Sequence, residues 1–407
     1  MTEKLLVSRA RSFLEKLCAF EPNRRTGSPG NREAVRFVAE RLRGFGLDVE
    51  TPTFECLDYI GKGAGLSLGD EVFPVHGSPY SPGCDVTGEL LCVETVRGLE
   101  ECECRGKLLL LKGEITAEQL MPKNFPFYNP EEHRHIYGLL EEKLPAAVIT
   151  ATRKNPGAVG ALDPFPMIAD GDFEIPSVYC TEETGVKIAV YEEERLSLKI
   201  DAERIPAKAS NVIARLGSKA GEKIVFTAHI DAYEDSPGAA DDASGVVALM
   251  LLAEIMAESM EAAGSLGIEL AILNGEDHYS AAGELDYLSR YGDELGKIRL
   301  LVNLDDVGYR EGGTHYSFYE CPEAIRGMTG ETFGGRPGFS EGPSWYQGDH
   351  MVFAQKGVPA IAFASERMEE FMAEYAHTRL DTPDLVDCGK LIDLAEALAA
   401  FTRNIRI

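Results

Sequence analysis

The stretch that decides the fold is "KIVFTAHIDAYEDSPGAADDASGVVALMLLAEIM", residues 223–256. It begins as an apolar, β-rich run, continues as a loop and ends as an apolar helix. One histidine and five carboxylates lie between residues 227 and 249. Carboxylates held close together repel one another unless a cation lies between them. A bound metal ion is therefore the first hypothesis for this stretch.

Two further apolar runs in the second half of the chain end in acids. They are "IELAILNGED", which ends in Glu276 and Asp277, and "IRLLVNLDD", which ends in Asp305 and Asp306. Because ligands bind beyond the carboxyl ends of strands in open parallel sheets, three such strands would direct these groups into one crevice. Helices alternate with the strands, so we expect an α/β fold with a mostly parallel central sheet flanked by helices.

The length of 407 residues exceeds what one hydrophobic core usually supports, which favours two domains. Residues 58–205 contain short β-rich runs separated by glycine and proline turns. We therefore expect a discontinuous α/β domain, residues 1–57 and 206–407, interrupted by an inserted β-rich domain. Residues 307–348 are expected to form a long loop that shapes the pocket.

Charge and cysteine content narrow the functional classes. The chain has 40 Lys plus Arg against 67 Asp plus Glu, a net charge of −27, which argues against binding to nucleic acid or to an anionic membrane. No window approaches the ~18 consecutive apolar residues of a membrane span. The N-terminus lacks a signal-peptide pattern, and the nine cysteines are scattered. These features favour a cytoplasmic protein; the oligomeric state stays open.

Two local features have ordinary explanations when taken alone. Asp241 and Asp242 immediately precede an apolar helix, where aspartate commonly caps the free amides. His377 lies in the polar segment "AEYAHTRLDTPDLVD", and a single loop histidine is usually a surface residue. A helix cap requires only one aspartate, however, and here there are two. The case for His377 as a functional residue depends on the other candidate residues that could lie near it.

Two histidines and three carboxylates form a candidate ligand set for two divalent ions. One carboxylate would bridge the ions, and each ion would take one histidine and one further acid, with room for a shared water. Glu276, directly before one of the acids, could serve as a general base without being a ligand. The ligand set is His229, Asp241, Asp277, Asp305 and His377.

At this point the motifs match a known family. "HID", "GAADDASG", "NLDD", "GDHMVFAQKGVPAIAF" and "HTRLDT" appear in order and cover about residues 205–385. The chain thereby resembles the co-catalytic di-zinc exopeptidases of the aminopeptidase Y and glutamate carboxypeptidase type. The resemblance implies a zinc exopeptidase fold, a peptide substrate and two Zn²⁺ ions, with other divalent metals possible.

The resemblance also assigns the ligands. It implies that Asp241 bridges the two ions, that His229 and Asp305 complete one site, and that Asp277 and His377 complete the other.

Further roles follow from the same resemblance. Glu276 would be the general base, and Asp231 would orient His229 and fix its tautomer. The peptide bond between Asp241 and Asp242 would be cis. In the substrate loop, Asp349 and His350 would act as buttresses through hydrogen bonds.

Tyr346 is the candidate for lining the specificity pocket. The chain departs from the family pattern at Asp277, where the family usually has glutamate, so the shorter ligand requires a local backbone shift. The inserted segment resembles a protease-associated domain, mainly through "IPSV" followed by a glycine.

The leading functional hypothesis is an aminopeptidase, and three alternatives remain. A carboxypeptidase would need arginines directed at the substrate carboxylate. A relative of the glutaminyl cyclases would bind one zinc, and a non-catalytic binding homologue would have lost ligands. The arginines available in the surrounding loops are Arg310, Arg326, Arg336 and Arg367.

Overall fold

The computed structural model divides the chain into two compact units, which we call the larger unit and the inserted unit. The larger unit comprises Met1–Cys56, Lys208–Phe371 and Tyr375–Ile407, and the inserted unit comprises Leu57–Ala207 with Met372–Glu374. The sequence led us to expect the insertion at residues 58–205. The structure describes residues 3–126, 128–154, 161–217, 221–258 and 266–405.

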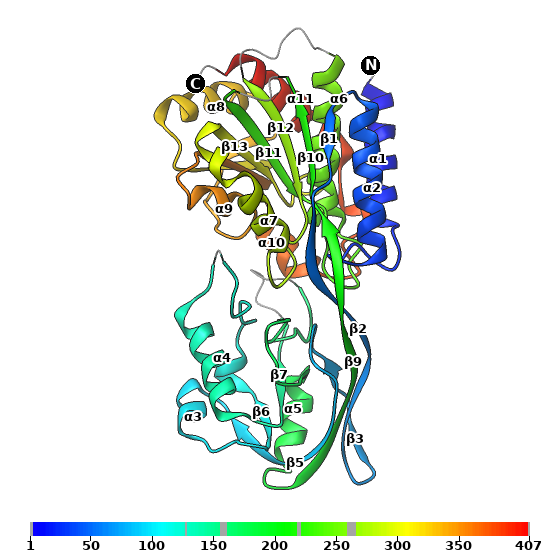
Figure 1. Ribbon diagram of the computed structural model, residues 1–407, viewed down its shortest axis with the longest axis vertical. Helices are drawn as coiled ribbons and strands as arrows, with labels where there is room; N and C mark the ends of the chain where they lie inside the picture. The colour runs from blue at the N-terminus through cyan, green and yellow to red at the C-terminus, as the bar shows by residue number, and fades with distance from the viewer. Residues whose placement is uncertain (1–2, 127, 155–160, 218–220, 259–265, 406–407) are drawn as a thin grey trace. The chain divides into compact units, whose positions relative to one another are not determined.

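The larger unit is built on an eight-stranded sheet (Figure 1). Four neighbouring strands, β12, β11, β13 and β16, are mutually parallel, whereas β1, β10 and β14 run antiparallel to neighbours. This confirms the expected α/β fold with a mostly parallel sheet. In spatial order the strands are β1 (Asp48–Glu50), β10 (Val212–Leu216), β12 (Gly267–Leu273), β11 (Lys223–His229), β13 (Ile298–Leu304), β16 (Ala360–Ser365), β14 (Thr314–Tyr319) and β15 (Phe339–Glu341).

Helices cover this sheet. α6 contacts α1, α2 and α11 as well as β11 and β13, α1 also contacts α11, and α9 contacts β13 and β16. α6 is apolar on nearly every side and buried along most of its length, as expected for a helix enclosed by other elements. The helices are α1 (Glu3–Cys18), α2 (Pro29–Gly44), α6 (Ser244–Glu258), α7 (Ala282–Tyr291), α8 (Glu323–Phe333), α9 (His350–Ala354), α10 (Met368–Glu374) and α11 (Cys388–Asn404), with short turns η2 (Ala239–Ala243), η3 (Gly292–Lys297) and η4 (Pro383–Leu385).

The expectation of a long loop over residues 307–348 is wrong. This stretch contains β14, α8 and β15, and it extends the central sheet at one edge. β14 reads "THYSFY", and its residues are buried apart from the half-buried His315. Aromatic and β-branched residues favour strands, so this run supports an additional sheet strand.

The inserted unit has its own eight-stranded sheet and apolar core. Strands β5, β6, β7 and β8 are parallel to one another, and two clusters of buried apolar side chains pack within the unit. Its kinship with a protease-associated domain stays a prediction. In spatial order the strands are β3 (Glu71–Phe73), β2 (Thr53–Leu68), β9 (Arg195–Ser210), β5 (Cys84–Val93), β6 (Leu108–Leu111), β7 (Ala147–Thr152), β8 (Ser177–Thr181) and β4 (His76–Gly77), and the helices are α3 (Val96–Glu101), η1 (Gly113–Thr116), α4 (Glu131–Lys143) and α5 (Glu182–Ala189).

Across the described residues, no helix combines the length and the apolar character that crossing a membrane would require.

Candidate metal centre

The centre lies at the carboxyl ends of three adjacent strands. β11 lies between β12 and β13 and is parallel to both. β11 ends at His229, β12 leads into the turn that contains Asp277, and Asp305 directly follows β13. All three strands are apolar and almost fully buried, so the polar groups begin where the sheet ends. The convergence predicted from the three apolar runs is therefore present.

Asp241 joins two pairs of side chains. Its Oδ1 lies 3.1 Å from Nε2 of His229, and its Oδ2 lies 3.2 Å from Nε2 of His377. Nε2 of His229 is also 3.6 Å from Oδ1 of Asp305, and Nε2 of His377 is 3.0 Å from Oδ1 of Asp277. All five side chains expected from the sequence are thus brought together, in two groups that share Asp241.

The donor set suits cations rather than hydrogen bonds alone. The ring nitrogens of His229 are buried and have no well-oriented hydrogen bond. Burial by itself lowers the pKa of both His229 and His377, but the facing carboxylates outweigh burial and raise both pKa values well above the usual range. Burial raises the pKa of Asp277, and the negative charge of Asp241 raises it further. A positive charge between these groups would offset both the repulsion and the burial.

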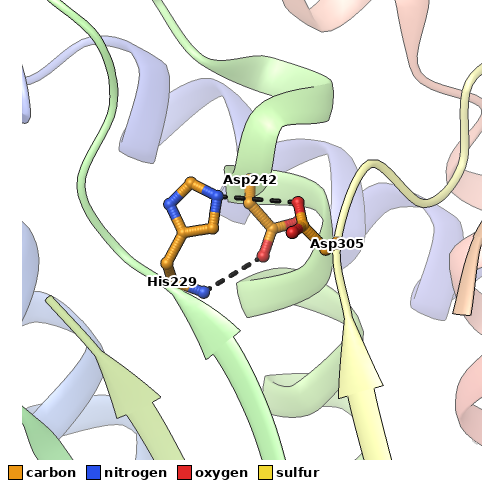
Figure 2. A group of neighbouring side chains, drawn as sticks. All are labelled: His229, Asp242 and Asp305. Atoms are coloured by element: carbon orange, nitrogen blue, oxygen red, sulfur yellow. Dashed lines mark hydrogen bonds and ion pairs between the residues drawn. The ribbon is translucent and has the colours of Figure 1, made fainter. Parts of the chain in front are cut away.

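The two adjacent aspartates have different positions. Asp242 is fully buried; its Oδ2 accepts a hydrogen bond from the amide of His229 (3.2 Å) and its Oδ1 accepts one from the amide of Gly245 in α6 (3.0 Å). Figure 2 shows its carboxyl group beside His229 and Asp305 at the end of β11. The helix-cap explanation therefore holds for Asp242, whereas Asp241 faces the two histidines. The peptide bond between them is cis, which confirms that prediction.

Asp231 connects three parts of the centre. Its Oδ1 lies 3.6 Å from Nδ1 of His229 and accepts a hydrogen bond from the amide of Gly275 (2.8 Å). Its Oδ2 accepts bonds from Thr26 Oγ1 (3.0 Å) and from the amide of Asp277 (3.2 Å). Burial raises its pKa, but the facing imidazole of His229 and these hydrogen-bond donors outweigh burial and keep the pKa below its usual value. One carboxylate thus positions both a histidine and the turn after β12.

Glu276 lies in that turn, one residue before Asp277. Burial is the main reason that its pKa is raised well above the usual range, and the negative charges of Asp305, Asp277 and Asp241 add to the effect. Glu276 is half-buried and directly precedes the candidate ligand Asp277 in this turn. A carboxyl with a raised pKa at such a position is suited to accept a proton.

Two residues that support Asp241 were not identified from the sequence. Asp381 is fully buried, and its two oxygens accept hydrogen bonds from the amides of Ala240 (2.8 Å) and Asp241 (3.2 Å). Burial raises the pKa of Asp381 to about 7. The segment "HTRLDT" contains Asp381 and could have indicated it.

Arg24 supports the same loop from the N-terminal part of the chain. Its buried guanidinium donates hydrogen bonds to the carbonyl oxygens of Ile230 (3.0 Å), Pro237 (2.6 Å) and Gly238 (2.8 Å). These bonds hold both ends of the loop that leads to Asp241. The sequence around Arg24 carries no motif that would have indicated this contact.

Replacement Asp381→Ala is expected to weaken zinc affinity by about 10- to 100-fold, because groups that orient ligands usually have effects of this size. The loss of two accepted hydrogen bonds would release the amides of Ala240 and Asp241. Competition with a chelator measures the affinity. Asp384→Ala is the matched control, since the Asp384 side chain is 92% exposed. Equal zinc affinity in Asp381→Ala and the wild type would show that Asp381 does not position Asp241.

The residues predicted for the substrate loop fall into two groups. Asp349 and His350 are buried, which suits the expected buttressing role, and their part in substrate binding stays a prediction. Nε2 of His350 donates to the carbonyl oxygen of Trp345 (3.1 Å), and burial lowers the pKa of His350 to about 4, which keeps the ring neutral. Tyr346 is 56% exposed and packs edge-on against Tyr319. Its role in substrate binding stays a prediction.

Comparisons with known proteins agree with this geometry. Residues 211–402 match peptidase family M28. The chain is 24% identical over 319 residues to the probable lipoprotein aminopeptidase LpqL of Mycobacterium tuberculosis; the match covers 75% of this chain but only 59% of that protein.

Solved structures show the same fold over nearly the whole chain. An aminopeptidase from Aneurinibacillus sp. strain AM-1 has a TM-score of 0.75 at 22% identity, covering 97% of this chain and 92% of that one. BSAP, a zinc aminopeptidase from Bacillus subtilis, has a TM-score of 0.73 at 19% identity, covering 97% and 93%. At these identities the comparison establishes the fold.

Proposed function

We propose that the protein is a di-zinc aminopeptidase of peptidase family M28, the family that residues 211–402 match, and that it removes N-terminal residues from peptides. The observation that carries this proposal is the position of Asp241. Its two oxygens face two different histidines, and each histidine has a further aspartate within 3.6 Å. This is the arrangement that a pair of ions sharing one carboxylate requires.

The residues present fit two zinc ions. Each proposed site offers one imidazole nitrogen and carboxylate oxygens, which are ligands that zinc accepts while keeping an open position. The buried ring nitrogens of His229 have no well-oriented hydrogen bond and are therefore available as metal ligands. When bound, two such ions lower the pKa of a water and polarise a peptide carbonyl. His229, Asp305 and Asp241 would hold one ion, and Asp277, His377 and Asp241 the other.

The protein's own groups would then move the proton. Glu276 takes a proton from the attacking water and delivers it to the nitrogen of the leaving amine, so that it acts first as base and then as acid. Asp231 holds Nδ1 of His229 and the amides of Gly275 and Asp277, which keeps the Glu276 turn in place. Asp231 thus fixes the backbone of the turn and makes no hydrogen bond to Glu276 in the described part of the chain.

The surroundings favour an aminopeptidase over a carboxypeptidase. A carboxypeptidase would need an available arginine to hold the terminal carboxylate of its substrate. Three of the four arginines that a carboxypeptidase could use already pair with neighbouring glutamates. The pairs are Arg310 with Glu311, Arg326 with Glu341 and Arg367 with Glu370.

Substrate and metal measurements together test the proposal. We expect aminoacyl nitroanilides to be cleaved, N-blocked peptides with free carboxyl ends to remain intact, and two zinc ions per chain in metal analysis. Cleavage of only the blocked peptides would instead identify a carboxypeptidase. One ion with cyclisation of N-terminal glutamine would identify a cyclase, and absence of metal and activity would identify a binding protein.

Chelation is expected to abolish activity while leaving the fold intact. The ligands lie beyond the ends of strands whose buried residues are almost all apolar, so the core of the larger unit does not depend on the ions. Circular dichroism after treatment with EDTA should match that of the untreated protein, and added zinc should restore turnover. Activity that survives exhaustive chelation would contradict the metal assignment.

A further inference from the structure

One buried acid beside the metal centre has no place in the ligand set. Asp306 directly follows the candidate ligand Asp305 at the end of β13, and it is 7% exposed. One carboxylate oxygen of Asp306 and one each of Asp305 and Asp241 all lie within 4.8 Å of one another. Oxygen atoms that close together can surround a single cation. Asp306 therefore adds a third carboxylate to the two that face His229.

The carboxyl group of Asp306 lacks the donors that satisfy a neighbouring acid. Its Oδ1 is buried and has no hydrogen-bond partner among the described residues. Asp242 also lies beside His229 and Asp305, but its two oxygens accept hydrogen bonds from backbone amides. A buried carboxylate oxygen without a donor is costly, and a bound cation would remove this cost.

An imidazole ring faces the same acids and is also available for a ligand. His229 is 1% exposed, and its Nε2 lies 3.1 Å from Oδ1 of Asp241 and 3.6 Å from Oδ1 of Asp305. This nitrogen has no well-oriented hydrogen bond. Imidazole nitrogen and carboxylate oxygen are both ligands of zinc. The Asp306 carboxyl and the His229 ring are thus two separate groups that point to one ion between Asp241 and Asp305.

The backbone holds Asp306 in a fixed and uncommon conformation. Its φ of +54° lies in the left-handed region, which glycine, asparagine and aspartate adopt more readily than other residues. Its carbonyl oxygen accepts hydrogen bonds from the amide (3.0 Å) and from Oγ (2.5 Å) of Ser365 in β16. Oγ of Ser365 also accepts a hydrogen bond from the amide of Tyr309 (3.1 Å). Ser365 therefore fixes the turn from which the Asp306 side chain projects.

We propose that Asp306 is a further ligand of the ion that His229, Asp305 and Asp241 would hold. This ion would have one imidazole and three carboxylates, whereas the ion beside His377 would have one imidazole and two carboxylates. A shared water would bring the first ion to five ligands, a number that zinc accepts at catalytic sites. The inference rests on the two-ion centre of the proposed function and adds a residue to one of its sites.

Two replacements that keep the backbone conformation test the ligand. Asparagine and glycine both tolerate a positive φ, but Asp306→Asn removes the charge and Asp306→Gly removes the whole carboxylate. In Asp306→Gly the affinity for one of the two zinc ions should fall by more than about 100-fold, which exceeds the usual effect of groups that only orient ligands. Competition with a chelator measures this affinity, and circular dichroism verifies the fold. Asp393→Asn is the matched control, since Asp393 is exposed on α11.

The visible absorption of bound Co²⁺ tests direct coordination. The position and intensity of the cobalt bands depend on the number and kind of ligands, so the bands should change in both Asp306 variants and stay unchanged in Asp393→Asn. The inference is overturned if the Asp306→Asn bands match those of the wild type. It is also overturned if the loss of zinc affinity in Asp306→Gly stays below about 100-fold, the range of a group that only orients ligands.

These measurements separate the new ligand from the proposed function. A wild type that binds two ions but cleaves no peptide would reject the function, while the cobalt bands would still decide whether Asp306 binds metal. Unchanged bands in the variants of an active peptidase would reject Asp306 as a ligand and leave the function intact.

Discussion

Glu276→Gln is expected to keep both zinc ions and to lower kcat by about 10²- to 10⁴-fold, the contribution typical of a general base. Glutamine has the same size and can still accept a hydrogen bond, but it cannot take up a proton at neutral pH. Glu276 is not a member of the ligand set, so metal content should not change. KM should change little, because Glu276 acts in the proton transfer of the chemical step and not in substrate binding.

Zinc analysis and steady-state kinetics on the same preparation check this result. Glu331→Gln is a matched control, since Glu331 is exposed on α8. Activity near that of the wild type would reject Glu276 as the base. Loss of zinc from Glu276→Gln would show instead that Glu276 contributes to the ligand set.

The second large effect concerns the shared ligand. Asp241→Ala removes both oxygens that face the two histidines, so His229 would be left with Asp305 and His377 with Asp277. Zinc sites with three protein ligands retain the metal, whereas two ligands on each side are too few for stable binding. We expect the loss of both ions on dialysis and no detectable turnover.

The control for Asp241→Ala lies in the same loop. Asp235 is exposed and pairs with Arg379 at 3.0 Å, and Asp235→Asn should keep zinc and activity. Two zinc ions in Asp241→Ala would remove Asp241 from the bridging position. Loss of only one ion would mean that it serves one site rather than both.

The central features of this fold could be predicted because buried parallel strands are apolar on both faces. In β12 and β13 the change from a mostly apolar run to acids marks the end of the strand, and this change points to Asp277 and Asp305. β14 was missed, because a short aromatic strand within a glycine-rich stretch resembles a loop in a single sequence.

The supporting groups could not be predicted for a different physical reason. Arg24 and Asp381 form hydrogen bonds with backbone carbonyl and amide groups. Every residue has these groups, so the sequence does not show which residues are the partners.

The hydrogen bonds of the segment that contains Arg24 and Thr26 have a consequence for biosynthesis. Arg24 bonds to Ile230 and Thr26 to Asp231, and the ribosome must translate the entire inserted unit before either partner exists. The inserted unit has its own apolar clusters and can condense first. The segment after the first helix therefore lacks these hydrogen-bond partners until the whole inserted unit has been synthesised.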